Sequence, residues 1–261
     1  MSGKIKQLLD AGQIVRTMHM GQLPSPKLIE VAAVLGGVDG VWIDQEHCDI
    51  STAQMEILLV ACRAAKMDAF ARVAPTDYAT VMRPMEAGCS GVMVAQIRTL
   101  DQVHQSVKWA NYPPIGERGI YPGNSEGAWG TVDLATHVSQ ANRDRWLSVQ
   151  IETTEAVEIV DQIAAVEGVD WLFVGPADLS VTLGVPGQFD HPDFLAALRR
   201  VSAACQAVGK PWGTLCRSVQ YAEQSRELGC QLFTIYGDLD SFKSGLEAGR
   251  DLFAGVLQKS G

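Results

Sequence analysis

The apolar run VWI at 41–43 leads into four ionisable residues: Asp44, Glu46, His47 and Asp49. Burying a charge without a partner costs free energy, so a core strand that ends in this way needs an explanation. The group could form a solvated loop, a metal site or acid–base machinery. His47 follows Asp44 by three positions, and it could be a base that a carboxylate holds in place. A solvated loop histidine is the alternative.

Two more carboxylates follow later apolar runs. Glu152 ends the segment LSVQIE, and Asp178 lies in GPADLS, one strand–helix unit later. Neighbouring strands lie about 4.8 Å apart, so carboxylates at two adjacent strand ends can share one divalent cation. Hard oxygen ligands favour Mg²⁺ or Mn²⁺. Taken singly, Glu152 could be a surface loop carboxylate, and Asp178 could be a helix N-cap.

Two further features could bind an anion. Arg72 lies near the end of the apolar segment DAFARV, and an arginine there must find an anion in the protein or in a substrate. A structural salt bridge is the alternative. The backbone N–H groups of GPADLS, at a predicted helix start, could also form an anion site, although an ordinary tight turn would have the same sequence. Gln96 and Gln150 stand at the ends of two other apolar runs.

Eight short apolar runs, each followed by a helical pattern, position these residues. They cover 14–20, 40–44, 68–73, 91–96, 147–152, 169–175, 211–216 and 232–237. Near-continuous apolar strands that alternate with helices predict a parallel sheet. Eight such units predict an α/β fold, a single (β/α)8 TIM barrel domain over 1–261. A doubly wound open sheet is the alternative, but the GxGxxG or GxxxxGK segment that it would want is missing after the first strand.

In such a barrel the strand ends and the loops that follow them build one site. We therefore expect the carboxylates, Arg72 and His47 to meet. The Gly- and Pro-rich stretch 111–146 is predicted to be a long functional loop after a strand. Ser51 is the predicted N-cap of the helix that follows the first acidic group.

The composition limits the classes of partner. The chain has 47% hydrophobic residues and a net charge of -9, which argues against nucleic acid or an anionic membrane as a main partner. The N-terminal segment lacks an apolar core, so no secretory signal is expected, and no apolar run approaches the length of a membrane span. Six cysteines without a CxxC pair indicate free thiols in a reducing cytoplasm.

Together, several segments resemble the HpcH/HpaI-type class II aldolases: WIDQEH, ARV, YPPIGERG, VQIETTEAV and VEGVDWLFVGPADLSVTLG. These are metal-dependent pyruvate aldolases that act on 2-keto-3-deoxy and 4-hydroxy-2-oxo acids. The resemblance covers roughly residues 7–255. It implies a (β/α)8 barrel whose C-terminal helix is swapped between the subunits of a homo-trimer or homo-hexamer.

The resemblance also implies roles for the residues at the strand ends. Glu152 and Asp178 are expected to bind a divalent metal ion, Mg or Mn, with Co, Ni or Zn also possible. Arg72 is expected to bind the keto oxygen of pyruvate and to stabilise the enolate. His47, oriented by Asp44, is expected to be the acid–base element.

A second set of residues is expected to support these groups. Glu46 and Gln150 would support the metal site or contact the substrate, and the backbone around Gly175, Ala177 and Asp178 would hold the pyruvate carboxylate.

The sequence departs from the family pattern at two positions and in one loop. Gln45 stands where glycine is common, and a larger side chain there could narrow the pocket or alter the waters on the metal ion. Glu86 stands where an aspartate often reaches the site of a neighbouring subunit. The loop at 118–130, RGIYPGNSEGAWG, also differs, and it is expected on the substrate-facing side.

The implied reaction is the cleavage of a 4-hydroxy-2-oxo acid to pyruvate and an aldehyde through a metal-stabilised enolate. It needs no Schiff-base lysine, and none of the predicted strands ends in lysine. The first alternative is an oxaloacetate decarboxylase or a related diacid lyase on the same scaffold. The second is a metabolite-binding barrel without catalysis, which would have no reason to keep Arg72, Glu152, Asp178 and His47 at one rim.

Overall fold

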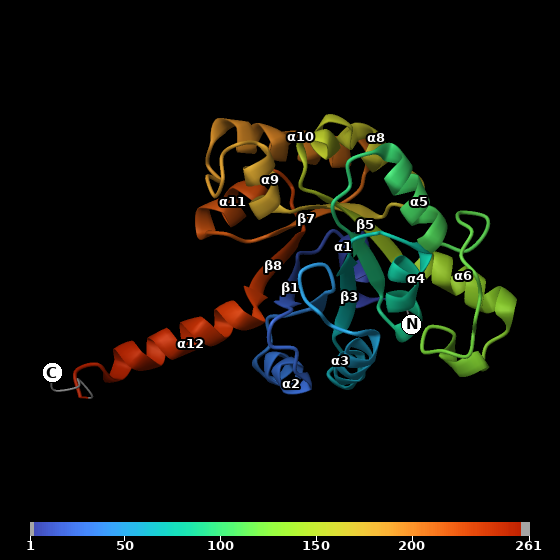
Figure 1. Cartoon of the computed structure of the whole chain (residues 1–261), viewed down its shortest axis with the longest axis horizontal. Coiled ribbons are helices and arrows are strands. Elements are labelled where there is room, and N and C mark those ends of the chain that lie inside the picture. The colour runs from blue at the N-terminus through green and yellow to red at the C-terminus, as the bar shows by residue number, and fades with distance from the viewer. Residues whose placement is uncertain (1–2, 257–261) are drawn as a thin grey trace.

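The computed structural model describes residues 3–256 and places eight parallel strands in a closed barrel (Figure 1). Each strand pairs with the next along the chain, and the last pairs with the first. The strands are β1 (Val15–Met20), β2 (Gly40–Asp44), β3 (Asp68–Val73), β4 (Gly91–Val94), β5 (Trp146–Ile151), β6 (Trp171–Val174), β7 (Trp212–Leu215) and β8 (Leu232–Gly237). The predicted (β/α)8 barrel is confirmed. Residues 1–2 and 257–261 of the predicted domain lie outside the described residues.

Helices surround the barrel and connect its strands. They are α1 (Lys4–Asp10), α2 (Pro26–Leu35), α3 (Thr52–Ala64), α4 (Tyr78–Ala87), α5 (Leu100–Ala110), α6 (Leu134–Asp144), α7 (Thr154–Glu158), α8 (Val160–Ala165), α9 (Pro176–Thr182), α10 (Pro192–Val208), α11 (Val219–Glu227) and α12 (Asp238–Phe253). Ser51 caps α3 as predicted, since its side chain accepts a hydrogen bond from the backbone of Gln54.

The inside of the barrel is filled by aromatic side chains. Trp42, Phe70, Trp146, Trp171 and Phe173 form one buried cluster with the apolar face of α1, which closes the amino-terminal end. A separate aliphatic core lies between the strands and the outer helices. The barrel interior is therefore packed with side chains.

The alternation of side chains along each strand places polar residues next to this aromatic interior, at the carboxyl ends of the strands. Successive side chains of a strand point to opposite faces, so the residue two positions after an inward aromatic also points inward. Asp44 follows Trp42 in this way, and Arg72 follows Phe70. The apolar core pattern and the polar rim are therefore set by the same two-residue period.

The segment 111–133 lies at the amino-terminal end of the barrel, away from the carboxyl ends of the strands. The stretch 111–146 was predicted to be a functional loop after a strand, and 118–130 to lie on the substrate-facing side. Both predictions are wrong, because α5 has already returned the chain to the other end of the barrel. Residues 125–128 line a cavity there together with Gly3 and Asp68. Within the segment, Arg118 donates two buried hydrogen bonds to the Glu126 carboxylate, of 2.9 and 2.5 Å.

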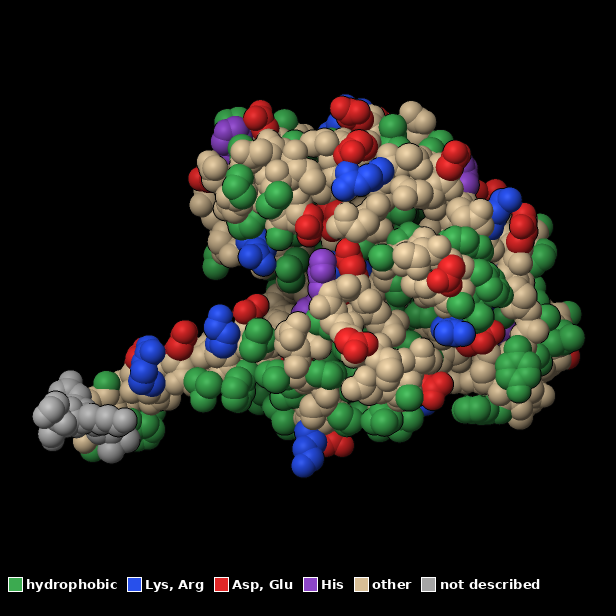
Figure 2. All heavy atoms as spheres, in the orientation of Figure 1, with side chains coloured by type: hydrophobic (Ala, Val, Ile, Leu, Met, Phe, Trp, Pro, Cys, Tyr) green, Lys and Arg blue, Asp and Glu red, His purple; other side chains and the backbone are tan. Residues whose placement is uncertain are grey.

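The C-terminal helix α12 projects away from the barrel (Figure 1). Its base is fixed, because the buried Asp238 carboxylate accepts hydrogen bonds from the backbone of Gly21 and Leu23. Charged side chains line one edge of the helix in Figure 2. Several large apolar side chains on it are exposed: Leu239, Phe242, Leu246, Leu252 and Phe253. No helix among residues 3–256 is long and apolar enough to cross a membrane.

Candidate active site

A cavity of about 790 Å³ opens at the carboxyl ends of the strands. Its size falls within the range of about 300–1,000 Å³ that is typical of small-molecule sites. Figure 2 shows a hollow beside the base of α12, with histidine side chains visible in it. Most of the predicted site residues line this cavity: His47, Arg72, Gln150, Gly175, Ala177 and Asp178.

Arg72 is held in place by Asp44 at the wall of the cavity. The guanidinium donates two hydrogen bonds to the Asp44 carboxylate, of 3.0 and 2.6 Å. His19 Nε2 lies 3.1 Å from the same carboxylate. Burial alone would raise the pKa of Asp44, but the hydrogen bonds from His19 and Arg72 outweigh it and hold that pKa well below its usual range. Asp44 is therefore ionised, and it fixes the orientation of the arginine.

His47 lies at the open side of the cavity. Its side chain is 57% exposed, and its Nε2 is 3.9 Å from the Glu46 carboxylate. The expected orientation of its ring by Asp44 is not found, because Asp44 reaches His47 only through the backbone N–H at 3.4 Å. The Asp44 side chain instead turns inward to Arg72 and His19, as the inward position after Trp42 requires.

Glu152 lies beneath the cavity and is fully buried. Its carboxylate accepts a 2.7 Å hydrogen bond from the backbone N–H of Gln96 and contacts the amide of Gln150. Gln96 has a positive φ of 56°, a conformation that non-glycine residues rarely adopt and that often marks a functional site. Burial first, and then the charges of Glu46 and Asp178, raise the pKa of Glu152 to about 7.

Gly175 allows the β6–α9 connection to approach Glu152. A Cβ at this position would lie 2.5 Å from Gln150 Nε2 and 2.6 Å from Glu152 Oε2. A larger residue would therefore displace both side chains. The first turn of α9 follows directly, and its N–H groups at Ala177 and Asp178 have no partners within the helix. Ala177 and Asp178 thus bring backbone donors and a carboxylate to the cavity wall.

The buried oxygens around Glu152 fit a divalent cation. Glu46 Oε2 lies 3.1 Å from Arg72 Nε, but that N–H is directed at Asp44, which leaves the oxygen without a hydrogen bond among the described residues. Gln150 Oε1 is also buried without one in this part of the chain. Carboxylates together with buried oxygens that accept no hydrogen bond are the kind of donor set that a hard metal ion prefers.

No group of three His, Cys, Asp or Glu residues within 3–256 is arranged to enclose a metal ion. In a site of the magnesium type, one or two carboxylates bind the ion and the other positions are left to water or substrate. Glu152 and Asp178 are the two that could hold it.

Gln45 and Glu86 do not line the cavity of their own chain. The Gln45 amide donates a 2.7 Å hydrogen bond to the carbonyl of Ile50, and its side chain faces a separate small cavity over α4. The expectation that Gln45 narrows the pocket is therefore wrong for this chain. Glu86 lies near the buried Arg118–Glu126 pair, and burial raises its pKa. A role for Glu86 in the site of a neighbouring subunit stays a prediction.

Several residues that line the cavity were not predicted from the sequence, among them His19, Arg217, Tyr236 and Asp240. His19 and Arg217 lie at or just after the ends of β1 and β7, so the strand-end rule could have identified both. Asp240 lies in the first turn of α12, where a helix N-terminal acid is ordinary and gives no signal.

The strand ends of the barrel thus bring Asp178 and the fixed Arg72 to one cavity, with the buried carboxylate of Glu152 beneath it. A cation fixed in this way can stabilise the negative charge of an enolate. The chain belongs to the HpcH/HpaI aldolase/citrate lyase family, whose model matches residues 16–243. It is therefore a lyase of the aldolase type. The family resemblance seen in the sequence is confirmed, and aldolases of this family depend in general on a metal ion.

Similar proteins agree over the whole chain. A 5-keto-4-deoxy-D-glucarate aldolase of Escherichia coli is 33% identical over 252 residues, which cover 96% of each chain. The crystal structure of an HpcH/HpaI aldolase from Desulfitobacterium hafniense superposes with a TM-score of 0.91 at 27% identity, covering 99% of each chain. A family protein from Burkholderia cenocepacia superposes with a TM-score of 0.87 at 32% identity, covering 98% of this chain and 99% of that one.

Proposed function

We propose that the protein cleaves a 4-hydroxy-2-oxo acid, of the 2-keto-3-deoxy class, to pyruvate and an aldehyde. The E. coli relative is named for a substrate of this class. The observation that carries the proposal is the buried Arg72. Asp44 fixes its planar guanidinium group beside the carboxylates of Glu152 and Asp178. A cation fixed in this way can stabilise charge that develops on a neighbouring keto oxygen.

Each group then has a task in the cleavage. Arg72 binds the keto oxygen, and the N–H groups of Ala177 and Asp178 hold the carboxylate of the oxo acid. A divalent ion held by Glu152 and Asp178 would supply Lewis-acid stabilisation of the enolate. Gln150 and Glu46 support this end of the site.

The bond changes balance without an oxidant or a reductant. The C4 hydroxyl gives up its proton, C4 becomes the aldehyde carbon, and the electron pair of the broken C3–C4 bond forms the enolate. His47 Nε2, at the open side of the cavity, accepts the hydroxyl proton. Protonation of the enolate at C3 then gives pyruvate.

Removal of metal should stop the exchange of the pyruvate methyl protons with solvent. Enolate formation does not need the aldehyde, so the exchange isolates the half-reaction that Arg72, Glu152 and Asp178 carry out. We expect chelated protein to be inactive in an NMR exchange experiment in D₂O and Mg²⁺ or Mn²⁺ to restore the exchange. If none of the divalent ions Mg, Mn, Co, Ni and Zn restored it, the proposal would be refuted, and a binding protein without catalysis would be favoured.

A decarboxylase of oxaloacetate, or a related diacid lyase, is the second candidate, because it forms the same enolate. The large cavity favours the aldolase, since a decarboxylase needs no room for an aldehyde. A panel of aldehydes offered together with pyruvate separates the two. Carbon–carbon bond formation with any of them supports the aldolase.

We also propose that α12 is swapped between subunits of a homo-trimer or homo-hexamer. A single chain leaves the apolar side chains of Phe242, Leu246 and Phe253 exposed on a projecting helix, which is costly for a monomer in water. Phe242→Asp/Leu246→Asp should therefore convert the oligomer to smaller species in light scattering after size exclusion. A wild-type protein that is monomeric at micromolar concentration would contradict the proposal.

We place the protein in the cytoplasm. All six cysteines are free in the structure, and four of them are buried: Cys62, Cys89, Cys205 and Cys230. Free thiols are typical of a reducing compartment. With a net charge of -9, small anionic metabolites that enter the cavity are its expected partners, and nucleic acid and membranes are not.

A further inference from the structure

The outer half of the cavity is built by the last third of the chain. Arg217 follows β7, Tyr236 lies at the end of β8, and Asp240, Ser241 and Ser244 lie in the first turns of α12. The proposed reaction assigns none of them a role. This half of the cavity is where the aldehyde part of a substrate would lie, because buried Trp42 and Phe173 close the cavity toward the barrel interior.

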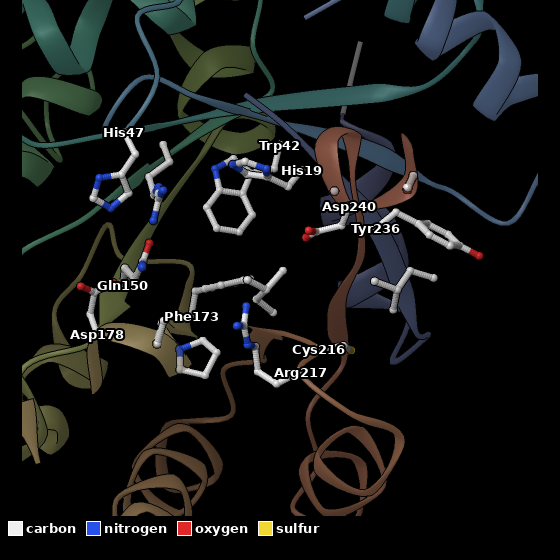
Figure 3. A pocket seen from close by; sticks show the side chains of 18 of the residues that line it. His19, Trp42, His47, Gln150, Phe173, Asp178, Cys216, Arg217, Tyr236 and Asp240 are labelled. Atoms are coloured by element: carbon white, nitrogen blue, oxygen red, sulfur yellow. The ribbon is translucent and has the colours of Figure 1, made fainter. Parts of the chain in front are cut away.

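Arg217 is a cation without a carboxylate partner in this half. Of the described residues that line the cavity, Arg72 and Arg217 are the lysines or arginines. Arg72 is already paired with Asp44, whereas Arg217 makes no ion pair within residues 3–256. Its guanidinium lies over the ring of Phe189 at 5.5 Å, a contact that steadies the side chain. Figure 3 shows it pointing into the cavity.

We propose that Arg217 is a specificity-determining residue, which binds a carboxylate on the aldehyde half of the substrate. The inference rests on the proposed aldolase function. The planar fork of arginine matches the two oxygens of a carboxylate. A substrate whose oxo-acid end lies at Arg72 extends outward, so an acidic group at its far end meets Arg217.

The neighbouring polar residues refine the substrate class. The carboxylate of Asp240 would repel an anion placed beside it, but it can accept hydrogen bonds from hydroxyl groups. Ser241 and Ser244 line the same wall and can donate or accept. These side chains can hold hydroxyl groups that lie between the oxo-acid end and the far carboxylate, and the aldehyde product keeps that carboxylate unchanged.

The test compares two acceptors of similar size in aldol addition to pyruvate. Succinic semialdehyde carries a carboxylate, and 4-oxobutanamide is its neutral counterpart. The wild-type enzyme should prefer the semialdehyde in kcat/KM, and Arg217→Gln should lower that preference by about ten-fold. Arg217→Lys should keep part of it. The preference should also fall as ionic strength rises.

Arg226→Gln is the matched control. Arg226 is an exposed residue of α11, it does not line the cavity, and its replacement changes the net charge by the same amount. This variant should keep the wild-type preference. A loss of preference in both variants would mean that net charge attracts the acceptor, and it would overturn the role of Arg217.

Exchange of the pyruvate methyl protons is measured in every variant to separate this inference from the proposed function. Normal exchange in Arg217→Gln with an unchanged acceptor preference would overturn the inference and leave the aldolase intact. A wild-type enzyme that does not prefer the acceptor with a carboxylate would also overturn the inference and leave the aldolase intact. Lost exchange in Arg217→Gln would show that Arg217 serves the pyruvate end, and no exchange in the wild type would overturn both proposals.

Discussion

Replacing Arg72 with methionine should lower kcat/KM for aldol cleavage by about 100- to 1,000-fold. This is the typical loss when one fixed donor at a developing oxyanion is removed. The exchange of pyruvate methyl protons should fall by a similar factor, because both reactions pass through the enolate. Arg72→Lys should recover little of the activity, since an ammonium keeps the charge but not the planar fork that Asp44 fixes.

A second variant separates this chemical loss from a loss of folding. Arg72→Met leaves the Asp44 carboxylate buried without its main partner, which should cost about 3–5 kcal/mol of unfolding free energy. The double change Arg72→Met/Asp44→Asn removes both charges and should regain much of that stability in urea unfolding, but none of the activity. Recovered activity in the double variant would show that Arg72 acts only by neutralising Asp44.

Replacing Glu152 with glutamine should abolish metal binding and activity. The amide cannot supply the charge that a divalent cation needs from this buried position. His47→Ala should keep metal binding, measured by calorimetry, while it slows the aldol reaction, because His47 stands at the open side of the cavity. The assigned roles would be exchanged if His47→Ala lost the metal and Glu152→Gln kept it.

The same Glu152→Gln change should stabilise the metal-free protein at alkaline pH. The folded pKa of Glu152 is raised from 4.5 to about 7, so its ionisation opposes folding. Wild-type stability should be fully present below about pH 4.5 and should fall as the pH rises to about 7. The loss approaches about 3 kcal/mol, at about 1.4 kcal/mol for each pH unit.

Urea unfolding at pH 5 and pH 8, with a chelator present, measures this effect. Glu152→Gln should lack the loss that the wild type shows between the two values. Glu155→Gln is the control, because Glu155 is an exposed residue of α7 that pairs with Arg98, and it should follow the wild type. Equal stability changes in all three proteins would show that the ionisation of Glu152 does not oppose folding.

The strands and the inward residues at their ends were predictable because their signals are local. The two-residue alternation that buries Trp42 also points Asp44 inward, and both are read from one short segment. The end of β4 was less predictable. The apolar pattern ran to Gln96, but β4 ends at Val94, and the left-handed backbone of Gln96 turns its N–H toward Glu152. That turn is stabilised by a residue far along the chain.

The partner of Asp44 could not be derived from sequence spacing. His47 is near in sequence, but His19 is near in space, because β1 pairs with β2 in a register that sets His19 beside Trp42. The place of segment 111–133 was missed for a related reason. Its composition resembles a functional loop, and only the direction of the preceding helix shows which end of the barrel it joins.

The order in which the cavity is built along the chain has an evolutionary consequence. The groups assigned to enolate formation lie between Asp44 and Asp178, and the outer wall lies between Leu215 and Ser244. One recombination event between β6 and β7 can therefore exchange the part of the gene that selects the aldehyde. The residues that form the enolate are then unchanged. The product of a duplicated gene can therefore acquire a new substrate without new catalytic residues.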